Sequence, residues 1–192
     1  MPPVTIAWAY AVLAAVLVVA AVIDVRTGRV PNYLTYPAVA IALIGHTLTG
    51  GLTGRHSPPS PGLAGALIGL AAGFLPLLVA WLMGGIGGGD VKLMGAVGAL
   101  AGWQLALSTL FYGFLAVLGL CVAIMIRRRV LKRTLLRVGR FLLLAWAPGG
   151  AHYPASVDSP KVPFALGLCI GGLVALAEVI ARGGRTPWLL GG

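Results

Sequence analysis

Long apolar runs, separated by short polar or glycine-rich segments, organise the chain. An α-helix rises about 1.5 Å per residue and the hydrocarbon core of a bilayer is about 30 Å thick, so about 20 apolar residues can cross it. The runs of this kind are Val4–Ile23, Tyr33–Gly51, Leu63–Met83, Val91–Ile126 and Val162–Ala181. We therefore predict an all-α fold, a polytopic bundle of membrane-spanning helices forming a single domain over residues 1–192.

The run Val91–Ile126 is too long for one span and short for two. A turn at Gly102, Trp103 and Gln104 would divide it and bring the total to about six spans. The part before this turn would be only about 18 Å long at the standard helical rise. It either begins inside the membrane or is lengthened by the glycine-rich segment that precedes it.

A basic stretch follows, from Arg127 to Arg140, in which leucines recur at helical spacing. Two interpretations of residues 127–145 stay open. One is an amphipathic helix lying on the anionic lipids of the inner leaflet. The other is a basic cytoplasmic loop.

Composition supports the membrane assignment, because 59% of the residues are hydrophobic and only 9% are charged. A soluble domain usually has about 25% charged residues. The net charge of +10 does not indicate a nucleic-acid partner, since the basic residues lie between apolar runs and not across a polar face. Cys121 and Cys169 both lie in apolar runs, and no spacing of Cys or His predicts a metal site.

The distribution of basic residues predicts the orientation. If the loop after the first helix is cytoplasmic, the basic residues on that side are Arg26, Arg29, Lys92, Arg127, Arg128, Arg129, Lys132, Arg133, Arg137, Arg140 and Lys161. Those on the outside are Arg55, Arg182 and Arg185. By the positive-inside rule this bias favours that topology in a cell or plasma membrane. It places Asp24 and Asp90 on the cytoplasmic side.

The chain has only four acidic residues, and two of them, Asp24 and Asp90, stand at helix ends on the same side. A carboxylate at the edge of a bilayer costs free energy, so it suggests a functional site. Either aspartate taken alone could equally be a surface charge in headgroup water, with Asp90 near Lys92. Glu178 has the spacing of a helical ion pair with Arg182.

The residues around both aspartates resemble the type IV prepilin peptidases, a branch of the GxGD aspartyl proteases. The first motif is an aspartate, a short basic stretch and a V-P-N-x-L segment, here Asp24, Arg26, Arg29, Val30, Pro31, Asn32 and Leu34. The second is GxGD with a following lysine, here Gly87, Gly88, Gly89, Asp90 and Lys92. A weaker match is the segment Val162–Leu166, VPFAL, before the last helix.

This resemblance implies that Asp24 and Asp90 are catalytic. Two carboxyl groups that share one proton supply both a base for water and an acid for the leaving amine. Gly87, Gly88 and Gly89 would let backbone approach the substrate. Lys92 would either hold the ionised carboxylate or reach the headgroups, and Pro31 and Asn32 would fix the turn into the second helix.

The resemblance also implies the partner, a prepilin or pseudopilin whose leader is cut at the cytoplasmic face, with no metal or cofactor. Long members of the family carry an N-terminal segment with CxxC pairs and methylate the new N-terminus. The sequence has no such pairs, so we expect a peptidase without methyltransferase activity. The alternative is a small ion- or proton-coupled transporter or channel in which the same two aspartates line the path.

Overall fold

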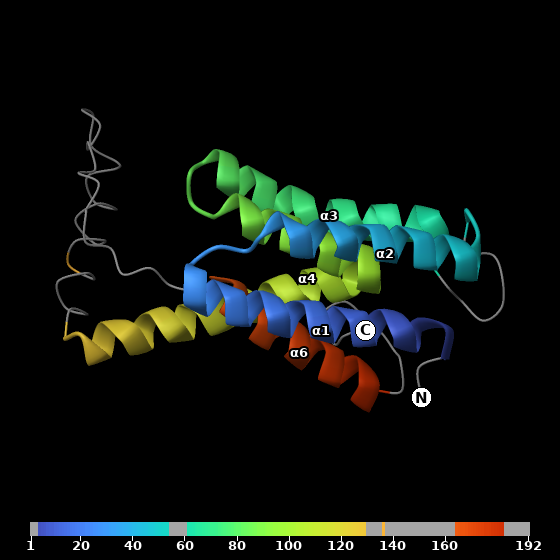
Figure 1. Cartoon of the computed structure of the whole chain (residues 1–192). Helices are drawn as coiled ribbons and strands as arrows, with labels where there is room; N and C mark the ends of the chain where they lie inside the picture. The colour runs from blue at the N-terminus through green and yellow to red at the C-terminus, as the bar shows by residue number, and fades with distance from the viewer. Residues whose placement is uncertain (1–3, 54–60, 130–135, 137–163, 183–192) are drawn as a thin grey trace, which may run out of the picture. The chain divides into compact units, whose positions relative to one another are not determined.

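The computed structural model describes residues 4–53, 61–129, 136 and 164–182, and the elements within these ranges are all helices (Figure 1). They are α1 (Val4–Thr27), α2 (Asn32–Gly50), α3 (Gly62–Leu82), α4 (Gly88–Arg127) and α6 (Phe164–Ala181). The predicted all-α class is confirmed. The apolar runs and the helices agree to within a few residues at each end.

The chain divides into two compact units, one of Met1–Val117 with Pro163–Gly192 and the other of Leu118–Val162. Within the second unit, the structure describes the end of α4, the residues up to Arg129, and Leu136. Most of residues 127–145 therefore lie outside the described residues, and a helix on the membrane surface there stays a prediction, as does the single domain. The candidate site lies in the first unit.

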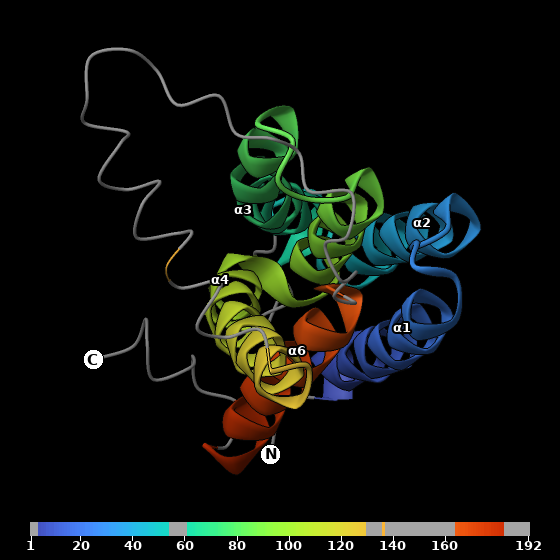
Figure 2. The same cartoon turned by 90° about the vertical axis from the view of Figure 1, so that its left-hand side faces the viewer.

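Small residues allow the helices of the first unit to pack closely. α1 packs along α6 and α2, and α2 packs along α3 (Figures 1 and 2). Gly69 of α3 and Gly98 of α4 touch through their backbones, because a Cβ atom on either would collide with the carbonyl oxygen of the other. A Cβ atom on Gly171 of α6 would likewise collide with backbone atoms of Gly113 in α4. Such contacts are typical of helices associating in lipid, where burial of apolar surface gives little driving force.

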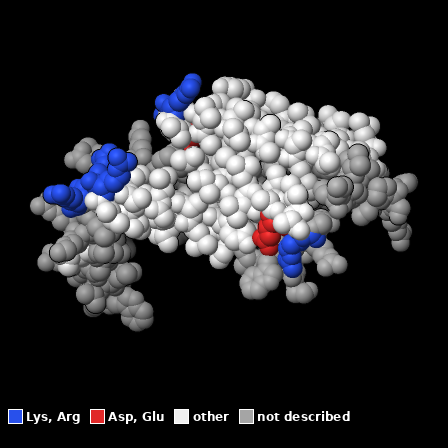
Figure 3. Space-filling model, turned by 90° about the horizontal axis from the view of Figure 1, so that it is seen from below, with Lys and Arg blue, Asp and Glu red and all other residues white. Residues whose placement is uncertain are grey.

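Four described helices are long and apolar enough to cross a membrane, over Ala7–Thr27, Gly62–Leu82, Gly88–Arg127 and Phe164–Ala181. Large apolar side chains face outward from them, including Ile68 (59% exposed), Leu75 (54%) and Leu115 (52%). On the face drawn in Figure 3, most of the described surface is neither basic nor acidic, and the charged residues form only a few small patches. Such a surface suits lipid and not water. The chain is a helical membrane protein, and the number of six spans stays a prediction.

The predicted turn in the run Val91–Ile126 is present at Gly102, where α4 leaves helical geometry with φ 83° and ψ 170°. A positive φ is readily adopted by glycine because it has no Cβ. The carbonyl of Leu100, just before this break, accepts a 3.0 Å hydrogen bond from Nε2 of the buried His46. A helix end leaves such carbonyls without intrahelical partners, so His46 caps the first part of α4.

Candidate active site

Asp24 lies in the last turns of α1, which continues to Thr27 where the sequence predicted an end at Ile23. The helix closes at Gly28, whose φ is 66° and whose N–H donates to the Asp24 carbonyl at 2.7 Å. The Asp24 side chain turns inward and is only 6% exposed. Its Oδ2 accepts a 3.0 Å hydrogen bond from the backbone N–H of Ala165, in the first turn of α6.

Asp90 lies in the first turn of α4, which begins at Gly88 and not at the predicted Val91. The N–H of Asp90 donates to the Gly87 carbonyl at 3.1 Å. A Cβ atom on Gly87 would lie 3.1 Å from Asp90 Oδ2, so the glycine leaves room for the carboxyl group. The other oxygen, Oδ1, is buried and has no hydrogen-bond partner among the described residues.

Gly89 brings the two sequence motifs together. A Cβ atom at this position would lie 2.7 Å from the carbonyl oxygen of Val30 and 3.1 Å from its Cβ. The start of α4 can therefore rest on the segment after α1 only because residue 89 has no side chain. This packing offsets the poor helix propensity of glycine and places Asp90 near Asp24, close enough for an electrostatic interaction between the two carboxyl groups.

The other predicted site residues, Pro31, Asn32 and Lys92, lie at the start of α2 and in the first turns of α4. Pro31 precedes α2 in an extended conformation, and Asn32 is the first residue of that helix, as predicted for the turn. Lys92 Nζ donates to Asn32 Oδ1 at 2.9 Å and lies 5.1 Å from the centre of the Tyr36 ring. Among the described residues, no ion pair joins Lys92 to either aspartate. Lys92 thus connects α4 to α2.

A small cavity of about 180 Å³ adjoins Lys92. Its lining residues, from α2, α3 and α4, are Thr35, Tyr36, Val39, Leu70, Phe74, Lys92 and Gly95. Most of these side chains are apolar. The cavity therefore has room for an apolar side chain beside the start of α4.

Sequence reasoning missed two contributors to the site. One is the backbone of Ala165, whose N–H binds Asp24. The signal for it was the VPFAL match before the last helix, which gave no role to that residue. The other is Trp81, whose Nε1 would lie 3.3 Å from a Cβ atom on Gly88 and which therefore packs against the glycine segment.

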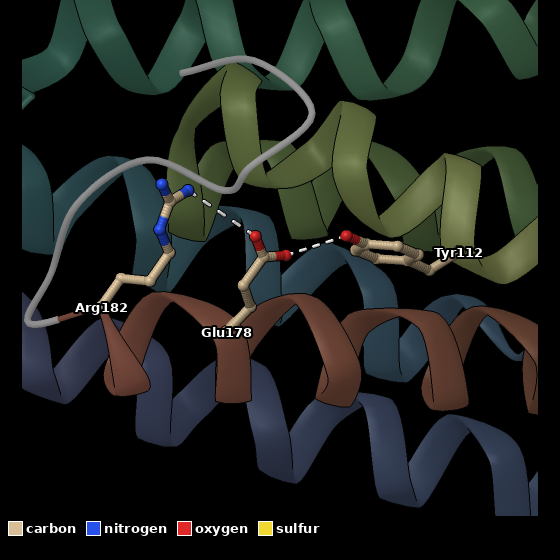
Figure 4. Close-up of polar contacts among 3 residues, drawn as sticks. All are labelled: Tyr112, Glu178 and Arg182. Carbon is tan, nitrogen blue, oxygen red and sulfur yellow. Dashed lines mark hydrogen bonds and ion pairs between the residues drawn. The ribbon is translucent and has the colours of Figure 1, made fainter. Parts of the chain in front are cut away.

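Glu178 forms the predicted ion pair with Arg182, with 3.8 Å between Oε1 and Nη1 (Figure 4). The tyrosine hydroxyl of Tyr112 also donates to Glu178 Oε2 at 2.9 Å, a contact between α4 and α6 that the sequence did not predict. Glu178 thus forms an ion pair with Arg182 and accepts a hydrogen bond from Tyr112.

Comparison with known proteins shows which proteins the chain resembles. The chain is 37% identical over 99 residues to prepilin leader peptidase/N-methyltransferases of Burkholderia pseudomallei strains 1026b and K96243. The alignment covers 48% of this chain but only 29% of those relatives. No solved structure matches. The family model for the type IV leader peptidase family matches residues 11–124, which include both aspartates. The chain belongs to the type IV leader peptidase family.

Proposed function

We propose that this protein is a membrane-embedded aspartyl endopeptidase that removes the leader of prepilin-like or pseudopilin substrates at the cytoplasmic face. The observation that carries the proposal is the placement of Asp24 and Asp90. Two motifs separated in the chain by most of α2 and all of α3 meet where Gly89 rests on Val30. The family match favours proteolysis over the transporter alternative.

In the proposed mechanism, a water molecule bound between the two carboxyl groups attacks the scissile carbonyl. One aspartate accepts the proton of this water, and the other donates a proton to the leaving amine. Two carboxyl groups that are close together favour this division, because they resist simultaneous ionisation. The mechanism involves no metal and no covalent intermediate on the enzyme.

The proposed substrate has a short basic leader followed by an apolar helix that enters the membrane beside the enzyme. A basic leader is repelled by a protein whose net charge is +10. Affinity must then come from the apolar helix and from backbone contacts, with anionic inner-leaflet lipids screening the charge. We also predict that the enzyme does not methylate the new N-terminus of its product. The mass of the cleaved prepilin tests this prediction, because a methyl group would add to it.

Co-expression with a prepilin from the same genome tests the proposal, with leader removal followed on gels. We expect the wild-type chain to cleave the prepilin. Asp24→Asn and Asp90→Asn should each abolish cleavage at normal expression, because each removes one member of the pair without changing side-chain volume. Cleavage that survives either substitution would contradict the aspartyl mechanism.

A further inference from the structure

Asp24 and Asp90 differ in the partners that surround them. Asp24 Oδ2 receives the N–H of Ala165, and Asp24 is 6% exposed. Asp90 is half-buried, and its Oδ1 atom is shielded from solvent but has no hydrogen-bond partner among the described residues. The pair is therefore asymmetric, because Asp24 accepts a backbone hydrogen bond and the buried oxygen of Asp90 accepts none.

This asymmetry bears on the location of the proton. A backbone N–H can only donate, and a hydrogen bond to an ionised oxygen is roughly twice as strong as one to a neutral oxygen. The Ala165 N–H therefore favours the charged form of Asp24. A buried ionised carboxylate with an unpartnered oxygen is costly, so the surroundings of Asp90 favour its neutral form.

Helix dipoles act in the opposite direction and must be compared with this effect. Asp90 lies in the first turn of α4, where the dipole favours an anion, and Asp24 lies in the last turns of α1, where it does not. Asp24, however, is bound by the first turn of α6, whose dipole favours an anion on Asp24. A direct hydrogen bond to a buried charge outweighs a dipole effect at a helix end.

The basic residues near the pair do not change which of the two aspartates is more easily ionised. Lys92, on the same helix as Asp90, is bonded to Asn32. Arg26 and Arg29, which follow Asp24 in the chain, have exposed side chains. In the part of the chain that the structure describes, neither aspartate forms an ion pair.

We infer that Asp24 is the ionised member of the resting pair, held by the Ala165 amide of α6, and that Asp90 carries the shared proton. Resting on the proposed function, this assigns the roles in peptide hydrolysis. Asp24 accepts the proton of the attacking water as the new carbon–oxygen bond forms. Asp90 gives its proton to the leaving nitrogen as the carbon–nitrogen bond breaks, and transfer of a proton from Asp24 to Asp90 restores the resting pair.

Infrared spectroscopy of the purified full chain in lipid nanodiscs at neutral pH tests the location of the proton without any substrate. The spectrum is simple because the chain has only four acidic side chains. We expect a carbonyl band of a protonated carboxyl group that shifts in deuterated water. The band should disappear in Asp90→Asn and persist in Asp24→Asn, and Glu178→Gln is the matched control that should retain it. Any other pattern between the two aspartate variants overturns the inference.

A second pair of variants tests the role of the Ala165 amide. Ala165→Pro removes the N–H donor at a position in the first helical turn where proline is tolerated, whereas Ala165→Gly keeps it. In an Asp90→Asn background, the proline variant should bind a proton at Asp24 about tenfold more tightly than the glycine variant, as seen by titration of the band. Equal titration of the two variants would contradict a role for this amide.

The two hypotheses can fail separately. If the infrared pattern is found but the prepilin is not cleaved, the proposed function fails and the proton assignment stands. If the prepilin is cleaved only with both aspartates but the band belongs to Asp24, the function stands and the inference fails.

Discussion

The first unit holds acidic side chains in two regions with different surroundings. Glu178 lies 3.8 Å from the guanidinium of Arg182 and accepts a hydrogen bond from Tyr112. Asp24 and Asp90 have no cation partner among the described residues, and one buried oxygen of Asp90 is unpartnered. Asp24 binds the start of α6 at Ala165 and Glu178 lies near its end, about 20 Å further along at the standard helical rise.

The difference matches the roles that we propose for these acids, structural for Glu178 and catalytic for Asp24 and Asp90. An acid that only joins helices is most stable when a cation and a hydroxyl group satisfy it, as at Glu178. A catalytic pair must exchange protons, and a tight ion pair would fix one protonation state. The buried side chain of Asp24 and the shielded Oδ1 of Asp90, both without a cation partner among the described residues, are therefore the surroundings that we expect of a functional site.

Gly89→Ala should have the largest effect of the variants that leave all acids in place. The new Cβ atom would lie 2.7 Å from the Val30 carbonyl oxygen, so the start of α4 must move and carry Asp90 with it. A displacement of about 1 Å can cost about 100-fold in rate, and we expect a loss of this size in prepilin cleavage.

Gly119→Ala is the matched control, since a Cβ atom there has no neighbour within 4 Å. It should leave cleavage unchanged and stabilise its helix slightly. Equal activity of the two alanine variants would show that the contact between Gly89 and Val30 does not position Asp90.

Glu178→Ala should have the opposite profile, a loss of stability with little loss of activity. It removes the acceptor of the Tyr112 hydroxyl and the partner of Arg182. We expect the free energy of unfolding in detergent to fall by about 1–3 kcal/mol, and Tyr112→Phe to cost about 1 kcal/mol. Cleavage by the folded variants should stay within about threefold of wild type. A loss as large as that of Gly89→Ala would remove the distinction between the two regions.

Lys92→Met should have a smaller effect, because Lys92 supports the site through Asn32. One hydrogen bond of this kind contributes about 0.5–1.5 kcal/mol, so cleavage should fall by about threefold to tenfold. Asn32→Ala should give a similar loss, and the double variant should be no worse than either single one. Independent, multiplying losses would instead indicate that Lys92 acts directly on a carboxylate or the substrate.

The sequence predicted the helices of the fold better than the contacts between them. Apolar length located the helices, and the scarcity of acids together with the flanking motifs selected Asp24 and Asp90. Apolar length could not show that α4 begins at Gly88, because the stability of that turn comes from packing on Val30. The amide of Ala165 was also beyond prediction, since any residue except proline supplies an N–H and only the fold aims it at Asp24.

The central claim is that Asp24 and Asp90 act as one catalytic unit, and the most direct test is the rate of leader removal by purified enzyme in lipid nanodiscs. The rates to compare are those of the wild type, Asp24→Asn, Asp90→Asn and the double variant. Groups that act as a unit give strongly non-additive losses, so all three variants should fall to the same background rate. The claim would be contradicted if one single variant kept substantial activity and the double variant lost the product of the two single effects.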